Sequence, residues 1–536
     1  MGRALWLLPA LALLAVGCGS GGFSDKVKSA RDKSGTNVFR YPIVTSPTTM
    51  DPHLVQDGDT IDLLQQVYEG LVGWSPENVP VGLVAESWQV SEDGLTYTFA
   101  LRKEAKFHNG REVTAEDVKW SFDRCTNPKL ASPIADAYLS DIVGVTERVS
   151  GKADTVTGIT VVDPMKVEIK LKQPTPYFLG KLTYIVGAVV PKESVPADSG
   201  MTEVSQMVGS GPFKLAEYKP QQLVALEANP EYHGGTPKIA RLERPVILDS
   251  VTRLNKFKAG EVDLVQLERQ DIASLQKSAE YKDQLRFFQR PAIWYVAMNR
   301  LQYPPFADKR VRQAFAMAID KRFIVEELLG GVNTLANSIV PPGVPGGDRK
   351  DANALPYDVE KAKALLAQAG YPGGKGLPPL NIFYREDRPD VKIVAEAVVS
   401  QLKANLGVEA KQQSREWGAY LTEYNAKRLP FCHMRWAADY LDPQNFLSHM
   451  LAIYGPENKM GMSNPAFDAL CKEADTTMDM TKRLPLYAQA EDIALQDAVW
   501  VPIYFQRDAE LISPRVSGLR ESLFGHLPHT TVEISD

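Results

Sequence analysis

A carboxylate between aromatic side chains occupies residues 436–440, which read Trp-Ala-Ala-Asp-Tyr. The residues leading into it, Phe431–Trp436, form an apolar run that predicts a β-strand. In open α/β sheets, ligands bind in the crevice beyond the carboxyl ends of the strands. Asp439, with Trp436 and Tyr440 beside it, is therefore predicted to lie where such a sheet binds its ligand.

The elements that must position this carboxylate are predicted within residues 380–436. Two helices alternate there with three apolar, strand-like runs. This alternation predicts a βαβαβ unit and a parallel sheet, and hence an α/β fold. The strands are expected at Leu380–Tyr384, Val408–Gln412 and Phe431–Trp436, and the helices at Val391–Leu402 and Trp417–Lys427.

Three further elements are predicted elsewhere in the chain. Residues 95–102 alternate apolar and polar side chains, which is typical of a half-buried strand. Thr114, with two acidic residues soon after it, predicts the start of a helix. Asp308 is the expected cap of a single helix over residues 308–330, which ends at two glycines.

The sequence lacks the common signatures of catalysis. It contains no Gly-x-Ser-x-Gly, no phosphate-binding Gly-x4-Gly-Lys-Ser/Thr, no His-Glu-x-x-His and no Cys-x-x-Cys. His526 and His529 form the one close pair of histidines, and Pro528 between them predicts a turn rather than a metal site. We therefore expect a protein that is not an enzyme and that carries no cofactor and no metal.

The composition is that of an ordinary globular protein. The chain has 536 residues, enough for three to four domain-sized units, with 44% hydrophobic and 24% charged residues. Its net charge of −6 lacks the basic excess typical of nucleic-acid binding. Beyond Cys18, the three cysteines Cys125, Cys432 and Cys471 are expected to be buried free thiols, with a Cys432–Cys471 disulfide as the alternative.

The N-terminus predicts a secreted, lipid-anchored protein. Arg3 precedes the apolar run Ala4–Val16, which is shorter than the roughly 20 residues that a membrane-spanning helix needs. The run ends in a sequence that resembles a bacterial lipobox, so Cys18 is the expected lipidation site. Residues 1–17 are then a signal peptide, and the Gly/Ser-rich residues 18–36 a flexible tether. The alternative is an ordinary secretory signal with an incidental cysteine.

Eight blocks of sequence, in the right order, resemble the family 5 extracellular solute-binding proteins of ABC importers, the oligopeptide, dipeptide and nickel group. The longest, VAESWQVSEDGLTYTFALRKEAKFHNGREVTAEDVKWSF, spans residues 84–122. Together they cover nearly the whole mature chain. The other blocks are residues 50–53, 68–71, 209–235, 257–264, 299–321, 435–447 and 464–470.

This resemblance implies a fold of the type II periplasmic-binding-protein kind, with two α/β lobes, a hinge and an extra inserted domain. Closure of the lobes about the hinge would bury the ligand between them. The implied parts are lobe I (37–68, 190–292 and 505–536), the inserted domain (69–189) and lobe II (293–504).

Within the family, the sequence is most similar to the oligopeptide-binding proteins. In those proteins the Asp of the Ala-Asp-Tyr motif pairs with the α-ammonium of the peptide, which implies that Asp439 is the amino anchor. A bound ammonium would neutralise a carboxylate that is otherwise costly to bury. The other site residues implied by the resemblance are Trp417, Trp436, Tyr440, Tyr138, and Gln56 in the loop Val55–Gly58.

Two departures from the oligopeptide-binding pattern concern this site. Enteric members carry a disulfide whose two cysteines are replaced here by Ala437 and Ala292. The basic residues that meet the peptide carboxylate fall at Tyr424 and His433, and Arg435 is the candidate substitute. His433 and Arg435 are therefore retained as candidate site residues.

The leading hypothesis is a monomeric, lipid-anchored binding protein of the bacterial cell envelope, on the periplasmic or extracytoplasmic side. It would capture short peptides and deliver them to the membrane permease of an ABC importer, without binding nucleic acid. Three alternatives stay open. They are a protein of the same class that binds an oligosaccharide, a nickel chelate or an opine; a secreted hydrolase; and a receptor that only senses peptide.

Overall fold

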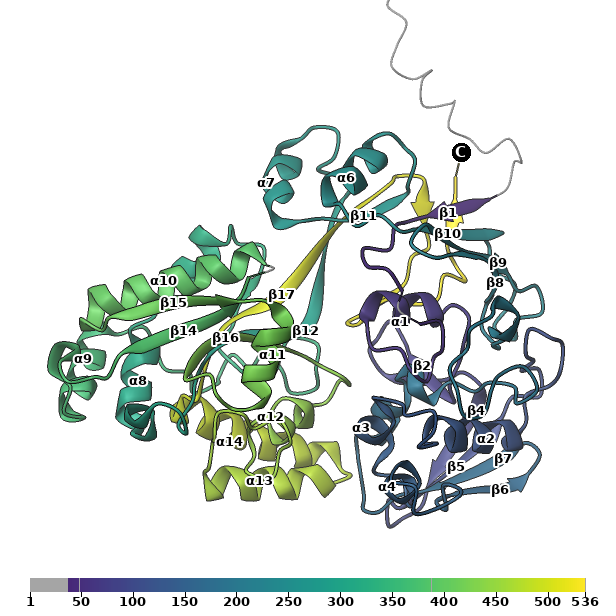
Figure 1. The fold of residues 1–536 in the computed structure, drawn as a ribbon, viewed down its shortest axis with the longest axis horizontal. Helices are drawn as coiled ribbons and strands as arrows, with labels where there is room; N and C mark the ends of the chain where they lie inside the picture. Colours follow the sequence, from purple (N-terminus) through teal and green to yellow (C-terminus); the bar gives the residue numbers. More distant parts are fainter. Residues whose placement is uncertain (1–36, 48, 387, 536) are drawn as a thin grey trace, which may run out of the picture.

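The computed structural model describes residues 37–47, 49–386 and 388–535. The predicted signal peptide, Cys18 and the tether lie outside these residues. Within the described ranges, no helix is both long and apolar enough to cross a lipid bilayer. Figure 1 shows two large bodies side by side, one formed by the first part of the chain and one by residues after about 290, with two long strands running between them.

A four-stranded sheet near the N-terminus has the order β1-β10-β9-β8. β1 pairs parallel with β10, and the other neighbours are antiparallel. Its apolar side chains belong to a core that includes Phe39, Phe213 and Leu226. The strands are β1 (Val38–Arg40), β8 (Phe213–Lys219), β9 (Leu223–Ala228) and β10 (Arg241–Pro245).

A second four-stranded sheet, of order β4-β5-β7-β6, has a core of its own. The strand predicted in residues 95–102 is confirmed as β5 (Thr96–Leu101). The predicted helix start at Thr114 is also confirmed, because Asp117 accepts hydrogen bonds from the backbone N–H and the hydroxyl of Thr114 at 2.9 and 2.8 Å. The remaining elements are β4 (Ala85–Val90), α2 (Ala115–Cys125), β6 (Ile159–Asp163) and β7 (Lys166–Lys170).

The largest sheet has seven strands in the order β11-β17-β12-β16-β14-β15, with β13 paired to β17. The predicted βαβαβ unit is confirmed: β14 lies parallel to both β15 and β16, and a helix follows each of β14 and β15. The strands are β11 (Leu264–Gln266), β12 (Leu285–Met298), β13 (Thr334–Leu335), β14 (Leu380–Arg385), β15 (Ala410–Arg415), β16 (Phe431–Ala437) and β17 (Trp500–Ile512).

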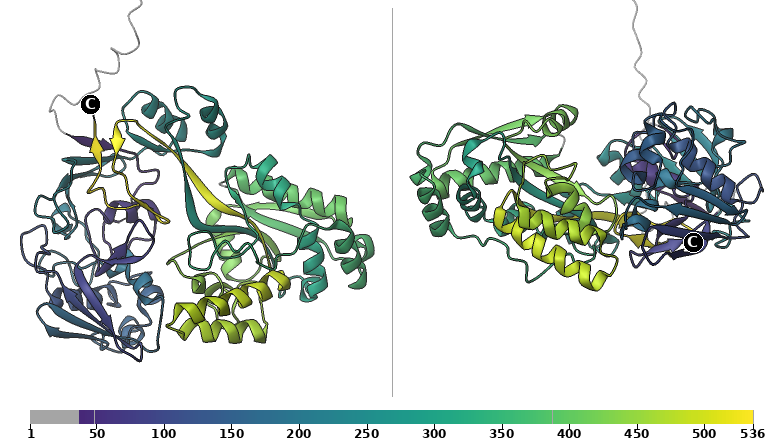
Figure 2. Two further views of the ribbon diagram at one scale, coloured as in Figure 1. Left: turned by 180° about the vertical axis from the view of Figure 1, so that it is seen from behind. Right: turned by 90° about the horizontal axis from the view of Figure 1, so that it is seen from below.

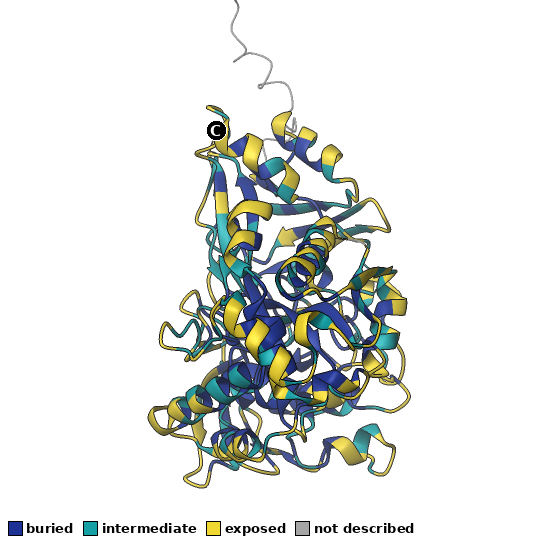
Figure 3. Ribbon diagram, turned by 90° about the vertical axis from the view of Figure 1, so that its left-hand side faces the viewer, coloured by how far each residue is buried: buried dark blue, intermediate teal, exposed yellow. Residues whose placement is uncertain are grey.

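Helices cover both faces of this sheet. α8, α9 and α10 pack on one face, in a core with Val296 and Phe315. α11 to α14 pack on the other face, in a core with Tyr295 and Phe446. Figure 3 shows the result, with buried residues in the interior and exposed residues along the outer sides of the helices. The helices are α8 (Lys309–Met317), α9 (Val359–Gln368), α10 (Pro389–Leu406), α11 (Trp417–Asn425), α12 (Ser448–Leu451), α13 (Pro465–Thr476) and α14 (Met480–Asp497).

The single helix predicted over residues 308–330 is wrong, because the structure has two helical segments there. Asp308 caps α8 as predicted, since its carboxylate accepts the backbone N–H of Arg310 at 2.8 Å. A π-helical segment, Phe323–Leu328, then starts anew. Asp320 separates the two, because its carboxylate accepts the N–H of Phe323 at 3.0 Å and so caps a second start.

Two long antiparallel strands, β12 and β17, pass between the bodies of the molecule, as Figures 1 and 2 show. Their register shifts between Gln289 and Ile293 and again between Trp294 and Tyr295. Such bulges bend and twist a strand pair. The irregularity therefore lies where the two strands enter the large sheet beside β16.

The remaining elements are short or lie at the periphery. They are α1 (Gly58–Leu64), α3 (Ala135–Leu139), α4 (Val145–Val149), α5 (Phe178–Leu182), α6 (Ser250–Lys258), α7 (Arg269–Lys277), β2 (Val72–Trp74), β3 (Pro80–Gly82), β18 (Val516–Ser517), β19 (Glu521–Ser522), β20 (Gly525–His526), β21 (Glu533–Ile534), and the 3-10 turns η3 (Ile185–Gly187), η4 (Val204–Gln206), η5 (Pro304–Ala307), η7 (Pro372–Gly374) and η8 (Pro443–Asn445).

Candidate functional site

Asp439 lies just past the end of β16, at the carboxyl edge of the large sheet. Its Oδ1 accepts a hydrogen bond from the hydroxyl of Tyr138 at 3.0 Å. Tyr138 belongs to α3, so this bond joins the large-sheet body to the domain that contains β5. The ring of Tyr184 stacks on Tyr138 with 3.8 Å between centroids, which fixes the position of the donor.

A buried asparagine orients the other side of the carboxylate. The Oδ1 of Asn445 accepts hydrogen bonds from the backbone N–H of Asp439 and from Nε1 of Trp436, each at 3.0 Å. Its Nδ2 donates to Oδ2 of Asp439 at 3.3 Å. The turn that carries Asn445 is itself fixed, because Asp442 pairs with the fully buried Arg483 at 2.6 Å. One amide therefore sets both the carboxylate and the indole.

Asp439 has neutral hydrogen-bond donors but forms no ion pair with any described residue. Burial raises the pKa of its carboxyl, while the hydrogen bonds from Asn445 and Tyr138 and the more distant charge of Lys181 oppose that rise. Lys181 is itself engaged by Asp141. A half-buried carboxylate in this state is suited to bind a cationic group, whose charge would replace the missing partner.

The strand edge beside Asp439 has no registered strand partner among the described residues. The hydroxyl of Tyr420 donates to the carbonyl of His433 at 3.0 Å, so this carbonyl points away from β12. Because backbone groups alternate along a strand, the N–H and C=O of Arg435 and Ala437 point to that same side. β14 registers with β16 only at Cys432, so among the described residues this end of the edge has no strand partner. An extended chain could pair there.

The two candidate tryptophans line different parts of this region. Trp436 is half-buried, and its ring lies 5.5 Å from that of His449. Trp417, the first residue of α11, is also half-buried, and the guanidinium of Arg385 lies 3.8 Å from its ring centre. Trp436 is thus held beside Asp439, because both donate hydrogen bonds to Asn445. One face of the Trp417 ring, in contrast, is already covered by the guanidinium of Arg385.

Tyr440 is buried at the junction between the two bodies. Its ring stacks on Tyr177 with 5.4 Å between centroids and 9° between planes, and its hydroxyl donates to Gln444. The Cβ of Tyr440 also lies close to Gly180, where an added Cβ would be 3.3 Å away. Tyr440 therefore packs between the inserted helix α5 and the turn that carries Asn445.

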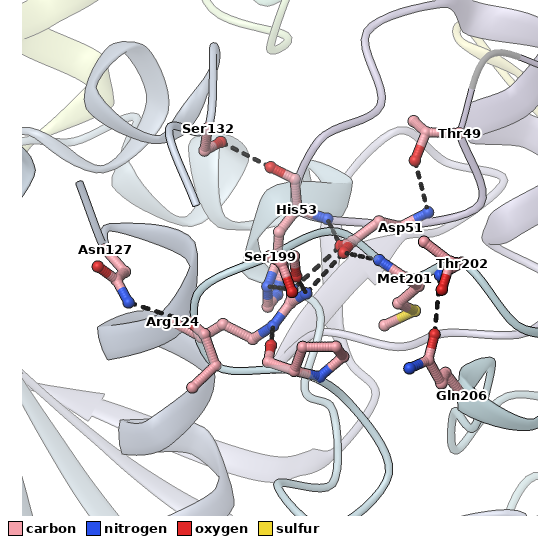
Figure 4. A network of polar contacts seen from close by, with 12 residues as sticks. Thr49, Asp51, His53, Arg124, Asn127, Ser132, Ser199, Met201, Thr202 and Gln206 are labelled. Carbon is pink, nitrogen blue, oxygen red and sulfur yellow. Dashed lines mark hydrogen bonds and ion pairs between the residues drawn. The ribbon is translucent and has the colours of Figure 1, made fainter. Parts of the chain in front are cut away.

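Gln56 lies in an exposed part of a loop whose neighbours are tightly held. Asp57 caps α1 by accepting the N–H of Thr60 at 2.9 Å. Earlier in the loop, Asp51 is fully buried and pairs with Arg124 of α2, with N···O distances of 2.6 and 3.1 Å. Figure 4 shows this guanidinium reaching Asp51 and His53 together. The loop that carries Gln56 is therefore anchored to the domain that contains β5.

His433 and Arg435 project from the opposite face of β16 to Trp436, as strand alternation requires. His433 is only 1% exposed and lies against Trp294, with 5.4 Å between centroids. Burial lowers its pKa to about 3, so the ring is neutral. Arg435 is half-buried at the strand end. Tyr424 is buried and contacts the hydroxyl of Tyr295 at 3.3 Å.

Sequence reasoning missed Asn445 and Tyr184 as residues that shape the site. The sequence could have indicated Asn445, because it is a polar residue six positions after Asp439 in a turn that contains proline. Tyr184 carried none, since it approaches Tyr138 only through the packing of the inserted domain.

Other candidate chemistry is not assembled among the described residues. Cys125, Cys432 and Cys471 are buried free thiols, as expected, and the alternative disulfide is not formed. Burial raises the pKa of each. No group of three or more His, Cys, Asp or Glu side chains in the described part of the chain could hold a metal ion.

Comparison with known proteins places the chain in a family. Residues 79–457 match the family model described as "Bacterial extracellular solute-binding proteins, family 5 Middle". The chain is 32% identical over 492 residues to a probable deoxycholate-binding periplasmic protein of Escherichia coli strain K12, covering 90% of each chain. It is 31% identical over 480 residues to the periplasmic oligopeptide-binding protein OppA of the same organism, covering 88% of this chain and 87% of OppA.

The fold matches as well. An unliganded, open form of the periplasmic murein tripeptide-binding protein MppA superposes with a TM-score of 0.80 and 27% identity, covering 94% of this chain and 98% of MppA. The predicted type II periplasmic-binding-protein fold is thereby confirmed. The chain belongs to the family 5 bacterial extracellular solute-binding proteins.

Proposed function

We propose that the protein binds short peptides through their amino terminus and delivers them to the permease of an ABC importer. The observation that carries this proposal is the carboxylate of Asp439, which has neutral donors but forms no ion pair with any residue that the structure describes. A peptide α-ammonium supplies that cation. The backbone groups of Arg435 and Ala437 that face away from β12 lie next along the chain and suit the main chain of an extended peptide.

The proposal gains support from relatives that bind peptides. OppA of Escherichia coli is named for oligopeptides and MppA for a murein tripeptide. Backbone pairing is indifferent to side chains, so it accommodates many sequences. Trp436 and Trp417 then offer broad apolar surfaces to those side chains. Tyr138 and Gln56 complete the proposed site from the facing side, Tyr440 lies beside Asp439 on the same side, and His433 supports the site from behind β16.

We further propose the domain division implied by the sequence. Lobe I comprises 37–68, 190–292 and 505–536, the inserted domain 69–189, and lobe II 293–504. The presence of separate cores and sheets supports a division into several domains, and β12 and β17 would then act as the hinge. Closure about these strands would cover the ligand.

The proposal also places the protein at the cell envelope. Cys18 is the proposed lipid-anchor site, supported by the short apolar segment that precedes it. The protein would act as a monomer, without a catalytic step, and present its closed form to the permease.

The test removes one charge from the protein and one from the ligand. Isothermal titration calorimetry would compare the wild type with Asp439→Asn, using Ala-Ala-Ala with a free or an acetylated amino group. Each change alone is expected to weaken binding about 100-fold, because a hydrogen bond between charged groups contributes up to about 3 kcal/mol. Both together should cost little more than either one, since they remove the same contact.

Asp154→Asn is the matched control, because Asp154 is exposed and the change in net charge is the same. It should bind like the wild type. Unchanged affinity in Asp439→Asn, or tighter binding of the acetylated peptide, would contradict the proposal.

A further inference from the structure

A hairpin formed by β19 and β20, over residues 521–526, joins the two bodies of the molecule. The C-terminal segment, yellow in Figure 1, lies on the first body and sends a loop toward the second. Leu523 at the tip is 8% exposed and belongs to the core of the large-sheet body, where an added Cβ at Gly343 would lie 2.6 Å from its side chain. Its backbone N–H donates to Oδ1 of Asn78 in the first body at 2.7 Å. One residue of the hairpin therefore contacts both bodies.

The tip of the hairpin also approaches the proposed ligand site. The ring of Phe524 lies 5.5 Å from that of Trp74, the last residue of β2. Trp74 in turn packs at Gly180, where an added Cβ would be 3.6 Å from the indole and 3.3 Å from Cβ of Tyr440. Because Tyr440 directly follows Asp439, a continuous series of contacts leads from Phe524 to the proposed amino anchor.

The base of the hairpin lies on the two long strands. Nε2 of His526 lies 2.8 Å from Oε2 of Glu510 in β17, and its ring is 5.7 Å from that of Phe288 in β12. An added Cβ at Gly525 would lie 3.2 Å from the guanidinium of Arg290, also in β12. The register of the two strands shifts just beyond these residues. The hairpin is therefore attached to the segment that we propose as the hinge.

Carboxylates surround His526 on three sides. Its side chain is 9% exposed, and its Nδ1 is buried without a hydrogen-bond partner among the described residues, 3.9 Å from Oε1 of Glu521. Burial alone would lower the pKa of His526, but the charge and hydrogen bond of Glu510, with the charges of Asp62 and Glu521, raise it above the ordinary histidine value. The folded protein therefore favours the cationic ring.

The other charged and titratable groups around this cluster have partners or stay neutral. His529 and Tyr41 face the ring from the first body, and burial lowers the pKa of His529 to about 3 and raises that of Tyr41. Above the ordinary histidine pKa, His526 is therefore the group of this cluster that changes charge. The arginines are Arg290, paired with Asp508 at 2.6 Å, Arg244, paired with Asp62 at 2.8 Å, Arg286, which donates to the carbonyls of Asp283 and Leu285, and Arg520, which donates to Pro528 and Thr530.

We propose that this hairpin is a strap between the hinge and the ligand site, and that the proton of His526 fastens it to β17. While the ring is a cation, its ion pair with Glu510 holds the base of the hairpin, and Phe524 keeps Trp74 against Tyr440. When the ring loses its proton, no cation separates the carboxylates on its two sides, and the hairpin loosens. Phe524 is then a positioning residue of the ligand site, and this last part rests on the proposed function.

Raising the pH should loosen the hairpin. Because the pKa of His526 is raised in the folded protein, the stabilisation from its ion pair is complete below the unfolded-state pKa and is lost as pH rises through the folded-state value. Each unit by which the folded-state pKa is raised corresponds to a tenfold change in the equilibrium between the held and the loosened hairpin. The hairpin should be held at pH 6 and should open more often at pH 9.

Hydrogen–deuterium exchange of the ligand-free full chain, resolved to the amide of Leu523, would measure this opening, since that N–H is bonded to Asn78. After correction for the intrinsic exchange rate, the protection of this amide in the wild type is expected to fall about tenfold between pH 6 and pH 9. His526→Gln keeps a donor toward Glu510 but cannot titrate, so its protection should agree at the two pH values to within about twofold.

His108→Gln is the matched control, because burial lowers the pKa of His108 to about 4 and this ring is neutral at both pH values. It should keep the wild-type fall. Protection that is independent of pH in the wild type, or an equal fall in His526→Gln, overturns the strap. If His526→Gln does not fold, Glu521→Gln at a half-buried carboxylate should show a smaller fall than the wild type, and an undiminished fall would overturn the proposal in the same way.

Calorimetry at pH 6 with Ala-Ala-Ala would test the link to the ligand site. Phe524→Ala is expected to weaken binding about 2- to 10-fold, the factor that corresponds to the contribution of one aromatic pair, whereas Phe524→Tyr keeps the ring and should bind like the wild type. Unchanged affinity in Phe524→Ala would overturn the positioning role. A wild type that binds no peptide would refute the proposed function, and the exchange experiment would still decide whether the strap exists.

Discussion

Asp51 and Asp439 are both shielded from water, but of the two only Asp51 has a cationic partner among the residues described, and their pKa values shift in opposite directions. Asp51 is 0% exposed, and burial alone would raise its pKa, but the hydrogen bonds and charge of Arg124, with His53, bring the pKa below its ordinary value. Asp439 is less buried, pairs with no cation in the described part of the chain, and keeps a raised pKa. The first arrangement is complete without a ligand. In the proposed function a ligand completes the second, and this difference would separate a structural ion pair from a binding site.

The same contrast holds for the arginines. Arg124 donates to Asp51, to the carbonyls of Pro196 and Ser199, and contacts His53 (Figure 4). The Nε of Arg435 is buried and has no hydrogen-bond acceptor among the described residues. The guanidinium of Arg124 is thus fully hydrogen-bonded, whereas one nitrogen of the Arg435 guanidinium is not. Arg435 lies at the sheet edge where we propose that the ligand binds.

Removing one partner of the Asp51–Arg124 ion pair should have the largest effect, and the effect is on stability. Arg124→Met leaves Asp51 buried with an uncompensated charge, so the free energy of unfolding is expected to fall by about 3–5 kcal/mol. Chemical denaturation followed by circular dichroism measures this. Asp51→Asn combined with Arg124→Met should recover part of the loss, and the exposed Arg310→Met should change little. A loss below about 1 kcal/mol would remove the distinction between the two carboxylates.

The second largest effect should come from lowering the pH, which is expected to affect peptide binding through Asp439 before it affects stability through Asp51. Asp439 must be ionised to hold an ammonium, and its raised pKa means that peptide affinity falls as pH drops through a value above that of an ordinary aspartate. Asp51 has a lowered pKa, so its contribution to stability is present above the unfolded-state pKa and is lost only as pH falls through the lower folded-state value.

A window of pH is therefore expected in which the protein is folded but binds peptide weakly. Affinity should fall up to about tenfold per pH unit there. Titration calorimetry and circular dichroism across pH 3 to 7 would measure both curves, and Asp439→Asn, already without the charge, should show no such fall. Coincident loss of fold and binding would contradict the comparison.

The smallest expected effect is a gain in stability. Because the pKa of Asp439 is raised, ligand-free protein loses stability as pH rises from the unfolded-state pKa through the folded-state value. Asp439→Asn removes that cost at neutral pH, and we expect the melting temperature of the ligand-free protein to rise by about 1–3 °C. Scanning calorimetry would test this, with Asp154→Asn as the control. A lower melting temperature would show that Asp439 is structural like Asp51.

Sequence patterns predicted the local parts of this architecture well. The βαβαβ unit was predictable because each strand and helix is encoded by its own run of residues. The helix predicted over Val391–Leu402 is α10, which ends at Gly407, a residue with φ of 68°. The position of Asp439 at a strand end followed from the same run. The break at Asp320 was missed, because a capping carboxylate interrupts a helix without disturbing its apolar periodicity.

The non-local parts could not be derived from spacing. Tyr138 reaches Asp439 across 301 positions, and its place in the site was only implied by the resemblance. The charged groups that act on Arg435 come from β12, β14, β17 and the cap of α10, and no local pattern joins them. Charge balance at a site is a property of the assembled fold, so an unpaired arginine has no signature in the sequence.

The place of β17 has a consequence for how the molecule is made. This strand lies between β11 and β12, well inside the seven-stranded sheet, yet it comes last of the seven in the chain. Leu285 of β12 therefore cannot pair with Leu511 of β17 until that late segment has been synthesised. Pairing over such separations is slow. A chain that stops before Trp500 leaves β11 and β12 with open edges of the kind that recruit other chains. Synthesis must therefore pass Ile512 before the sheet can close, and products truncated before β17 are expected to aggregate rather than to fold in part.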